Sequence, residues 1–278
     1  MKLLVLGSGQ DAGVPQINCE CINCVAARKN PKQRRLGPSI ALINEEKRYA
    51  YLIDASPDIK QQIDILNEFT SKNGKQEPIP LEGIFLTHAH FGHCSGLWSL
   101  GKECWDVKEM KVFCSPKMGE FLKTHHPFKH LLERKNVVLK TIEPEVKLKI
   151  KDFNIRPIKV PHRNEYADTV GYILSFNKMV AYIPDFDTWT KNLVKEVKKV
   201  DIALIDGSFY QHGELPRMAE VPHPPMEETM HLLKDPDSEI YFTHFNHTNP
   251  VLQKDSKEYD KIIENDFALT EDGLVIDF

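Results

Sequence analysis

The densest chemical signal in this sequence is a group of three histidines within six residues: His88, His90 and His93. The apolar run Gly83–Leu86 comes directly before it and predicts a buried strand. Neutral imidazole is a common ligand for zinc, iron and other transition metals, and loops at strand ends often carry functional residues. We therefore interpret the segment as a metal site at a strand end; the alternative is a solvated loop that happens to be rich in histidine.

Length and composition are those of an ordinary globular protein. The chain has 278 residues, 41% hydrophobic and 27% charged, with a formal net charge of −4. Length alone allows one large domain or two small ones, and we expect a single domain over residues 1–278. We expect neither nucleic acid nor a membrane as a partner. No apolar run approaches the ~20 residues that span a bilayer. The first run, Leu3–Leu6, is too short for a signal peptide, so we expect a cytoplasmic location.

Short apolar runs alternate with helical stretches along the chain, which favours a layered α/β fold. The pattern alone does not separate a doubly wound sheet from a four-layer sandwich. Helices are expected at residues 59–66, 94–100, 116–123, 190–197, 226–233 and 257–263. Strands are expected at residues 3–6, 40–43, 49–53, 83–86, 111–114, 153–160, 170–176, 179–183, 202–205 and 240–242.

Three further residues that can bind metal each follow an apolar run: His162, Asp185 and His244. A single histidine at a strand end is more often structural than a ligand. Three separate strands that each end in such a residue form a coherent pattern, and we predict that all three are ligands. Asp187 is the weaker competitor for the role of Asp185.

A second metal site is predicted near the N-terminus, where Cys19, Cys21 and Cys24 form a Cys-x-Cys-x-x-Cys cluster. In a reducing compartment such a cluster is expected to bind metal and not to form disulfides. Three thiolates can hold one zinc ion at ~2.3 Å each, and a tetrahedral structural site needs a fourth ligand. His247 is the candidate. The alternative is a loop of free thiols.

The spacing of His88, His90 and His93 resembles the metallo-β-lactamase superfamily motif His-x-His-x-Asp-His. The resemblance implies an α/β fold of the metallo-β-lactamase type, a four-layer αββα sandwich. Gly92 stands where the family has an aspartate ligand, so the second metal is expected to be weakened or absent. The resemblance implies one or two active-site ions of zinc, manganese or iron. The first would be held by His88, His90 and His162, and the second by His93 and His244, with Asp185 bridging.

Two branches of this superfamily show further likeness. PhnP phosphodiesterases carry a Cys-x-Cys-x-x-Cys loop, and a zinc-binding histidine follows a catalytic-metal histidine by three residues. His244 and His247 have the same spacing. PqqB, the pyrroloquinoline quinone biosynthesis protein B family, is similar over nearly the whole chain, although PqqB proteins typically lack the early histidines of the motif. The PqqB-like stretches are Leu4–Ser8, Gly13–Cys19, Asn23–Cys24, Ala55–Ile59, Gln61–Ile63, Leu204–Gly207 and Asn246–Leu252.

The resemblance implies an enzyme in which Asp185 and His223 take part in catalysis. His223 precedes an expected helix and could contact substrate or donate a proton; the alternative is a loop histidine without a role. Asp54 is expected to orient a ligand histidine. Asp206, which ends a buried strand, is a further candidate for such a supporting role.

Three functions are compatible with these residues. The first is a metal-dependent hydrolase that attacks a small anionic molecule, such as a phosphodiester, with metal-activated water. The second is a PqqB-like enzyme of cofactor biosynthesis that uses iron and dioxygen. The third is a non-catalytic protein that holds only one structural zinc. We rank the hydrolase first because of its set of metal-ligand residues. The sequence leaves both a monomer and a homodimer open.

Overall fold

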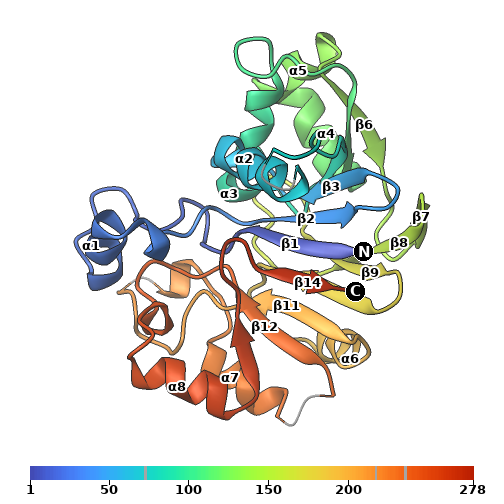
Figure 1. The fold of residues 1–278 in the computed structure, drawn as a ribbon. Coiled ribbons are helices and arrows are strands. Elements are labelled where there is room, and N and C mark those ends of the chain that lie inside the picture. Colours follow the sequence, from blue (N-terminus) through green and yellow to red (C-terminus); the bar gives the residue numbers. More distant parts are fainter. Residues whose placement is uncertain (72–73, 217, 235–236) are drawn as a thin grey trace.

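The computed structural model describes residues 1–71, 74–216, 218–234 and 237–278. Within these ranges, two seven-stranded mixed sheets lie face to face, with helices on their outer faces (Figure 1). In spatial order, the first sheet contains β14 (Val275–Asp277), β1 (Lys2–Gly7), β2 (Ser39–Asn44), β3 (Tyr49–Ile53), β4 (Leu81–Phe85), β5 (Met110–Cys114) and β6 (Val137–Thr141). The second contains β13 (Phe267–Leu269), β12 (Glu239–Thr243), β11 (Ile202–Asp206), β10 (Met179–Ile183), β9 (Val170–Ser175), β8 (Phe153–Lys159) and β7 (Leu148–Ile150).

Helices cover the outer face of each sheet. The first sheet is covered by α2 (Ile59–Thr70), α4 (Pro116–Thr124) and α5 (Phe128–Glu133). The second is covered by α6 (Lys191–Val197), α7 (Met226–Leu232) and α8 (Lys257–Glu264). The remaining α-helices in the described ranges are α1 (Ile22–Lys29) and α3 (Phe91–Cys94). They contain the candidate ligands Cys24 and His93, respectively.

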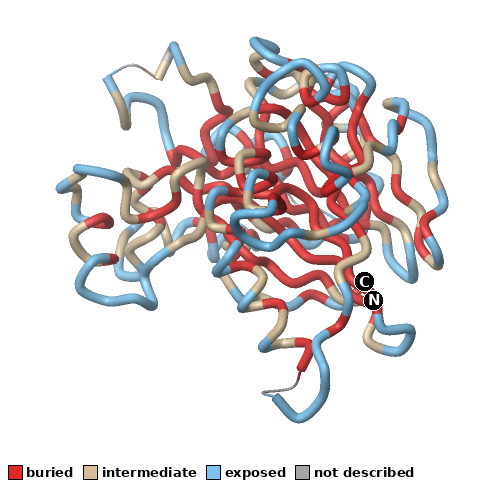
Figure 2. The backbone as a smooth tube through the Cα atoms, turned by 90° about the horizontal axis from the view of Figure 1, so that it is seen from above, coloured by how far each residue is buried: buried red, intermediate tan, exposed pale blue. Residues whose placement is uncertain are grey.

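The side-chain alternation of the strands explains why both faces of each sheet are buried. In β1, Leu3 and Val5 pack between the two sheets, whereas Leu4 and Leu6 pack against the helices. Successive strand residues point to opposite faces, so a strand buried on both faces reads as a continuous apolar run. Figure 2 shows the resulting buried centre. The predicted four-layer αββα sandwich is confirmed.

Strand direction brings the candidate ligands to one edge of the sandwich. Strands β3 to β6 run parallel in the first sheet, and β10 to β13 run parallel in the second. The chain leaves β4, β8, β10 and β12 in loops at this edge. These loops carry the ligand candidates His88, His162, Asp185 and His244.

All ten expected strands have counterparts in the structure, but the sequence did not predict β6, β7, β13 or β14. Three of these strands have only three residues, and four of the five residues of β6 are partly or fully exposed. The helix expected at residues 94–100 is instead α3 followed by a 3₁₀ turn at Ser95–Leu100.

The two ends of the chain meet in the first sheet, where β14 pairs antiparallel with β1. The amino group of Met1 lies 3.2 Å from the carbonyl oxygen of Phe278. Among the described residues there is no helix with the length and apolar character needed to cross a membrane.

Candidate metal centre

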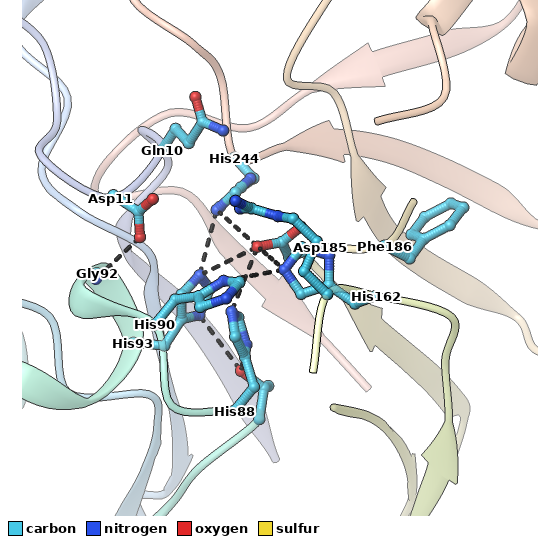
Figure 3. A network of polar contacts seen from close by, with 12 residues as sticks. Gln10, Asp11, His88, His90, Gly92, His93, His162, Asp185, Phe186 and His244 are labelled. Atoms are coloured by element: carbon cyan, nitrogen blue, oxygen red, sulfur yellow. Dashed lines mark hydrogen bonds and ion pairs between the residues drawn. The ribbon is translucent and has the colours of Figure 1, made fainter. Parts of the chain in front are cut away.

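Three histidine rings converge around the first candidate metal position (Figure 3). His88 and His90 lie on the loop after β4, and their ring centroids are 4.6 Å apart. His162, which follows β8, places its Nε2 3.0 Å from His90 Nδ1. These nitrogens and a carboxylate oxygen of Asp185 lie within 4.8 Å of one another, which is close enough for one ion to contact all four.

Asp185 lies at the centre of the histidine cluster. Its Oδ2 is 3.2 Å from His162 Nε2 and 3.4 Å from His88 Nε2. The same oxygen is 3.8 Å from His93 Nε2 and 3.9 Å from His244 Nε2, and these two nitrogens lie 3.2 Å apart. The carboxylate therefore faces both candidate metal positions, as a bridging ligand would.

The donor set fits a divalent transition metal. His88 Nε2 and Asp185 Oδ1 are buried and, within the described part of the chain, accept or donate no hydrogen bond. Buried polar atoms without partners are costly, and coordination to a metal would satisfy them. Burial lowers the pKa of His88 to about 3 and that of His93 to about 4, so both rings are neutral, as metal ligands must be. Imidazole and carboxylate together suit zinc, manganese and iron.

Each ligand histidine has its second ring nitrogen held by a neighbouring group. Such partners set the tautomer and orientation of a ligand ring. Asp54 Oδ2 accepts from His93 Nδ1 at 2.7 Å, as expected from the sequence, and Asp187 Oδ1 accepts from His162 Nδ1 at 2.7 Å. The remaining pairs are Thr87 Oγ1 with His88 Nδ1, Glu165 Oε2 with His90 Nε2, and Ser208 Oγ with His244 Nδ1.

Two of these positions have unusual backbone conformations. Asp54 has φ 68° and His244 has φ 65°, in the left-handed region that residues other than glycine rarely adopt. Such conformations cost about 1–3 kcal/mol and concentrate at functional sites. This strain cannot be read from the sequence, because it depends on the contacts that hold the loops.

His223 forms a buried pair with Asp206 beside the cluster. Its Nδ1 lies 2.6 Å from Asp206 Oδ2 and 3.4 Å from Asp185 Oδ1. Burial opposes a charge on the ring, but the two carboxylates outweigh it and raise the pKa of His223 to about 9. From the sequence, Asp206 was predicted only to support another residue, without a named partner. The structure pairs it with His223.

The cysteine cluster meets His247 as the spacing predicts. Cys19 Sγ lies 3.3 Å and Cys21 Sγ 3.6 Å from His247 Nδ1. All four ligand atoms, including Cys24 Sγ, lie within 4.8 Å of one another. Asn23 Nδ2 donates to the carbonyl oxygen of His247 at 2.9 Å, which holds the two loops together. We name this Cys₃His group, at which a structural zinc is predicted, the zinc clip.

Replacing Cys21 with serine is expected to remove one zinc ion per chain and to lower Tm by about 4 °C or more. Such a shift corresponds to about 2 kcal/mol in a chain of this size, and structural zinc sites contribute directly to folding. Elemental analysis and calorimetry measure the two effects. Cys104, which is exposed, supplies the matched control variant Cys104→Ser. Unchanged zinc content in Cys21→Ser would contradict the clip.

Comparison with known proteins assigns the chain to a family. Residues 49–245 match the family described as "Beta-lactamase superfamily domain". The chain belongs to the beta-lactamase superfamily. Coenzyme PQQ synthesis protein B of Methylorubrum extorquens (strain PA1) is 28% identical to this chain over 305 aligned residues. The alignment covers 100% of both proteins. The protein of that description from Klebsiella pneumoniae is 29% identical over 308 residues, with 99% of this chain and 98% of the relative covered.

Solved structures show the same superfamily fold. Zn(2+)-bound PqqB from Methylobacterium extorquens superposes with a TM-score of 0.85 at 25% identity, with complete coverage of both chains. A diphosphatase from the PhnP family superposes with a TM-score of 0.73 at 23% identity, over 100% of this chain and 96% of that one. The predicted resemblances to the superfamily, to PqqB and to PhnP proteins are thus confirmed.

The structure also shows what surrounds Gly92, the departure from the superfamily motif. The backbone N–H of Gly92 donates to Asp11 Oδ1 at 2.9 Å. Asp11 lies on the loop after β1, next to Gln10, whose Nε2 is 3.1 Å from His223 Nε2. Neither residue was predicted from the sequence, nor was Glu165, since no motif connects them with the histidines.

Proposed function

We propose that this protein is a metal-dependent hydrolase that acts on a small phosphodiester or a related anionic ester. The observation that carries the proposal is the convergence of His88, His90, His162 and Asp185 on one point, with His93 and His244 beside them. A bound metal of this kind lowers the pKa of water to about 7 and so supplies a nucleophile at neutral pH.

The residues of the chain supply positioning and proton transfer around this centre. Asp187 and Asp54 hold the rings of His162 and His93 in place. Protonated His223, held by Asp206, is the proposed donor of a proton to the leaving group. His223 lines a pocket of about 790 Å³ together with Asp187 and Trp189, which gives it access to a substrate.

Arg163 is the proposed contact for the negative charge of the substrate. It follows His162 in the chain and lines a small cavity of about 160 Å³ together with Gln10 and Asp11. Its Nε is buried and has no hydrogen-bond partner among the residues that the structure describes. A guanidinium group with an unused donor is suited to bind an anionic oxygen.

Replacing Arg163 with alanine should lower kcat/KM for a phosphodiester about 10- to 100-fold, mainly through a higher KM. A hydrogen bond to a charged group contributes about 1.5–3 kcal/mol, and each 1.4 kcal/mol is tenfold in affinity. Steady-state kinetics measure the effect. Arg134→Ala, which removes the same charge from an exposed position, is the control. Equal effects of both variants would argue against a role of Arg163 in substrate binding.

A second candidate function is a PqqB-like step of cofactor biosynthesis. It is favoured by the full-length similarity to proteins named for coenzyme PQQ synthesis. The same histidine and carboxylate donors can bind iron and leave positions open for dioxygen. This alternative predicts iron in the anaerobically purified protein and oxygen consumption with a tyrosine-derived substrate. The absence of iron affinity would argue against it.

The test of the hydrolase is metal-dependent turnover of bis(p-nitrophenyl) phosphate. The protein is stripped with a chelator and then reloaded with zinc or manganese. Turnover should disappear on stripping and return on reloading. Full activity in the stripped protein would overturn the proposal, because turnover would then not depend on a bound metal.

A further inference from the structure

The loop after β1 is hydrogen-bonded to the chain neighbours of both histidines of the second candidate metal position. Phe245, the neighbour of His244, donates its N–H to Ser8 O at 2.8 Å, and its carbonyl oxygen accepts from Gln10 N at 2.9 Å. One residue further, Asp11 Oδ1 accepts from the N–H of Gly92, the neighbour of His93. The loop is therefore held next to both His93 and His244, whose Nε2 atoms lie 3.2 Å apart. Figure 3 shows the contact of Asp11 with Gly92.

The close approach of this loop explains why position 92 holds glycine. A Cβ atom at Gly92 would overlap the Cα and Oδ1 atoms of Asp11. Cα belongs to the backbone, so the overlap could not be relieved by a rotation of the Asp11 side chain. No aspartate fits at position 92 while the loop keeps this path, and the volume that its side chain would need is filled by Asp11.

We propose that Asp11 supplies the carboxylate ligand of the second metal in place of the aspartate that is absent at Gly92. The inference rests on the metal centre of the proposed function and concerns a divalent cation such as zinc or manganese. One oxygen of Asp11, Oδ1, accepts the N–H of Gly92, and the carboxylate has a second oxygen, Oδ2, that can bind an ion. The second site thus keeps the charge of a carboxylate, although this comes from a different loop.

A purely structural role for Asp11 makes a different prediction. Asp11 accepts the N–H of Gly92 in the first turn of α3. In a purely structural role, it would cap this helix and bind no metal. Asparagine has nearly the same shape and also accepts this N–H through its amide oxygen, but it lacks the negative charge. The variant Asp11→Asn therefore keeps the cap and removes the proposed ligand charge.

The experiment measures metal bound per chain across a series of buffered free zinc concentrations, by equilibrium dialysis and elemental analysis. The wild type should bind two ions besides that of the zinc clip. Asp11→Asn should weaken the second of these about 10-fold or more, since even groups that only support a ligand change metal affinity 10- to 100-fold. Asp64→Asn, which removes a carboxylate from an exposed position on α2, is the matched control and should leave the second ion in place.

The outcomes separate this inference from the proposed function. The zinc clip reports folding, because its ion should remain bound in Asp11→Asn with an unchanged far-UV circular dichroism spectrum. Equal binding of both active-site ions by wild type and Asp11→Asn would overturn the role of Asp11 alone. A wild type with only one active-site ion would also overturn it while leaving the hydrolase intact. A wild type with only the clip ion would overturn both.

Discussion

Replacing His88 with alanine should reduce kcat/KM for bis(p-nitrophenyl) phosphate by about 1,000-fold or more. His88 Nε2 is a buried atom without a hydrogen-bond partner in the described structure, 3.4 Å from Asp185 Oδ2, and it has no evident role apart from metal coordination. Metal catalysis contributes several kcal/mol to transition-state stabilisation, and about 4 kcal/mol corresponds to 1,000-fold. Parallel elemental analysis should show loss of active-site metal with the zinc clip intact.

Asp187→Asn is the graded control for this prediction. Asp187 only holds the ring of His162, by a contact of 2.7 Å to Nδ1, and loss of such a support costs about 10- to 100-fold. The order of effects should therefore be His88→Ala above Asp187→Asn. Wild-type turnover in His88→Ala would show that the catalytic site lies elsewhere.

Replacing His223 with alanine should lower kcat about 100- to 10,000-fold while the bound metal stays in place. This is the usual contribution of a general acid or base. The effect should depend on the leaving group, because nitrophenolate leaves readily without protonation and an alkoxide does not. In His223→Ala, kcat should therefore fall further for a phosphodiester with an alkyl leaving group than for bis(p-nitrophenyl) phosphate.

His212 supplies the control histidine for that experiment. It is exposed, it lines the same pocket as His223, and it pairs with Glu228 at 2.7 Å, so His212→Ala should change kcat little. A uniform loss with both leaving groups in His223→Ala would assign His223 to the support of Asp185 and not to proton transfer.

The sequence predicted those strands and ligand residues that are marked by an apolar run or by a motif. The strands buried on both faces, such as β1 and β10, were visible as apolar runs because each consecutive side chain meets a core. The short strands β7, β13 and β14 carry no such run, and their position depends on pairing with distant segments; β14 pairs with β1 from the far end of the chain.

The same distinction applies to the candidate site. Histidines and cysteines with ligand spacing were identified from the motif and from strand ends. Asp11 was missed because it meets Gly92 across 81 residues of sequence, and only the path of the loop after β1 brings them together. The Asp206–His223 pair was also missed as a pair, since 17 residues and a loop separate its members.

The most direct test of the central claim is the metal content of anaerobically purified wild type and His88→Ala. The hydrolase predicts zinc in the clip of both proteins, together with additional zinc or manganese that is present in the wild type and missing from His88→Ala. Additional iron in the wild type would favour the PqqB-like oxygenase over the hydrolase. Identical metal content in the two proteins would contradict the metal centre itself.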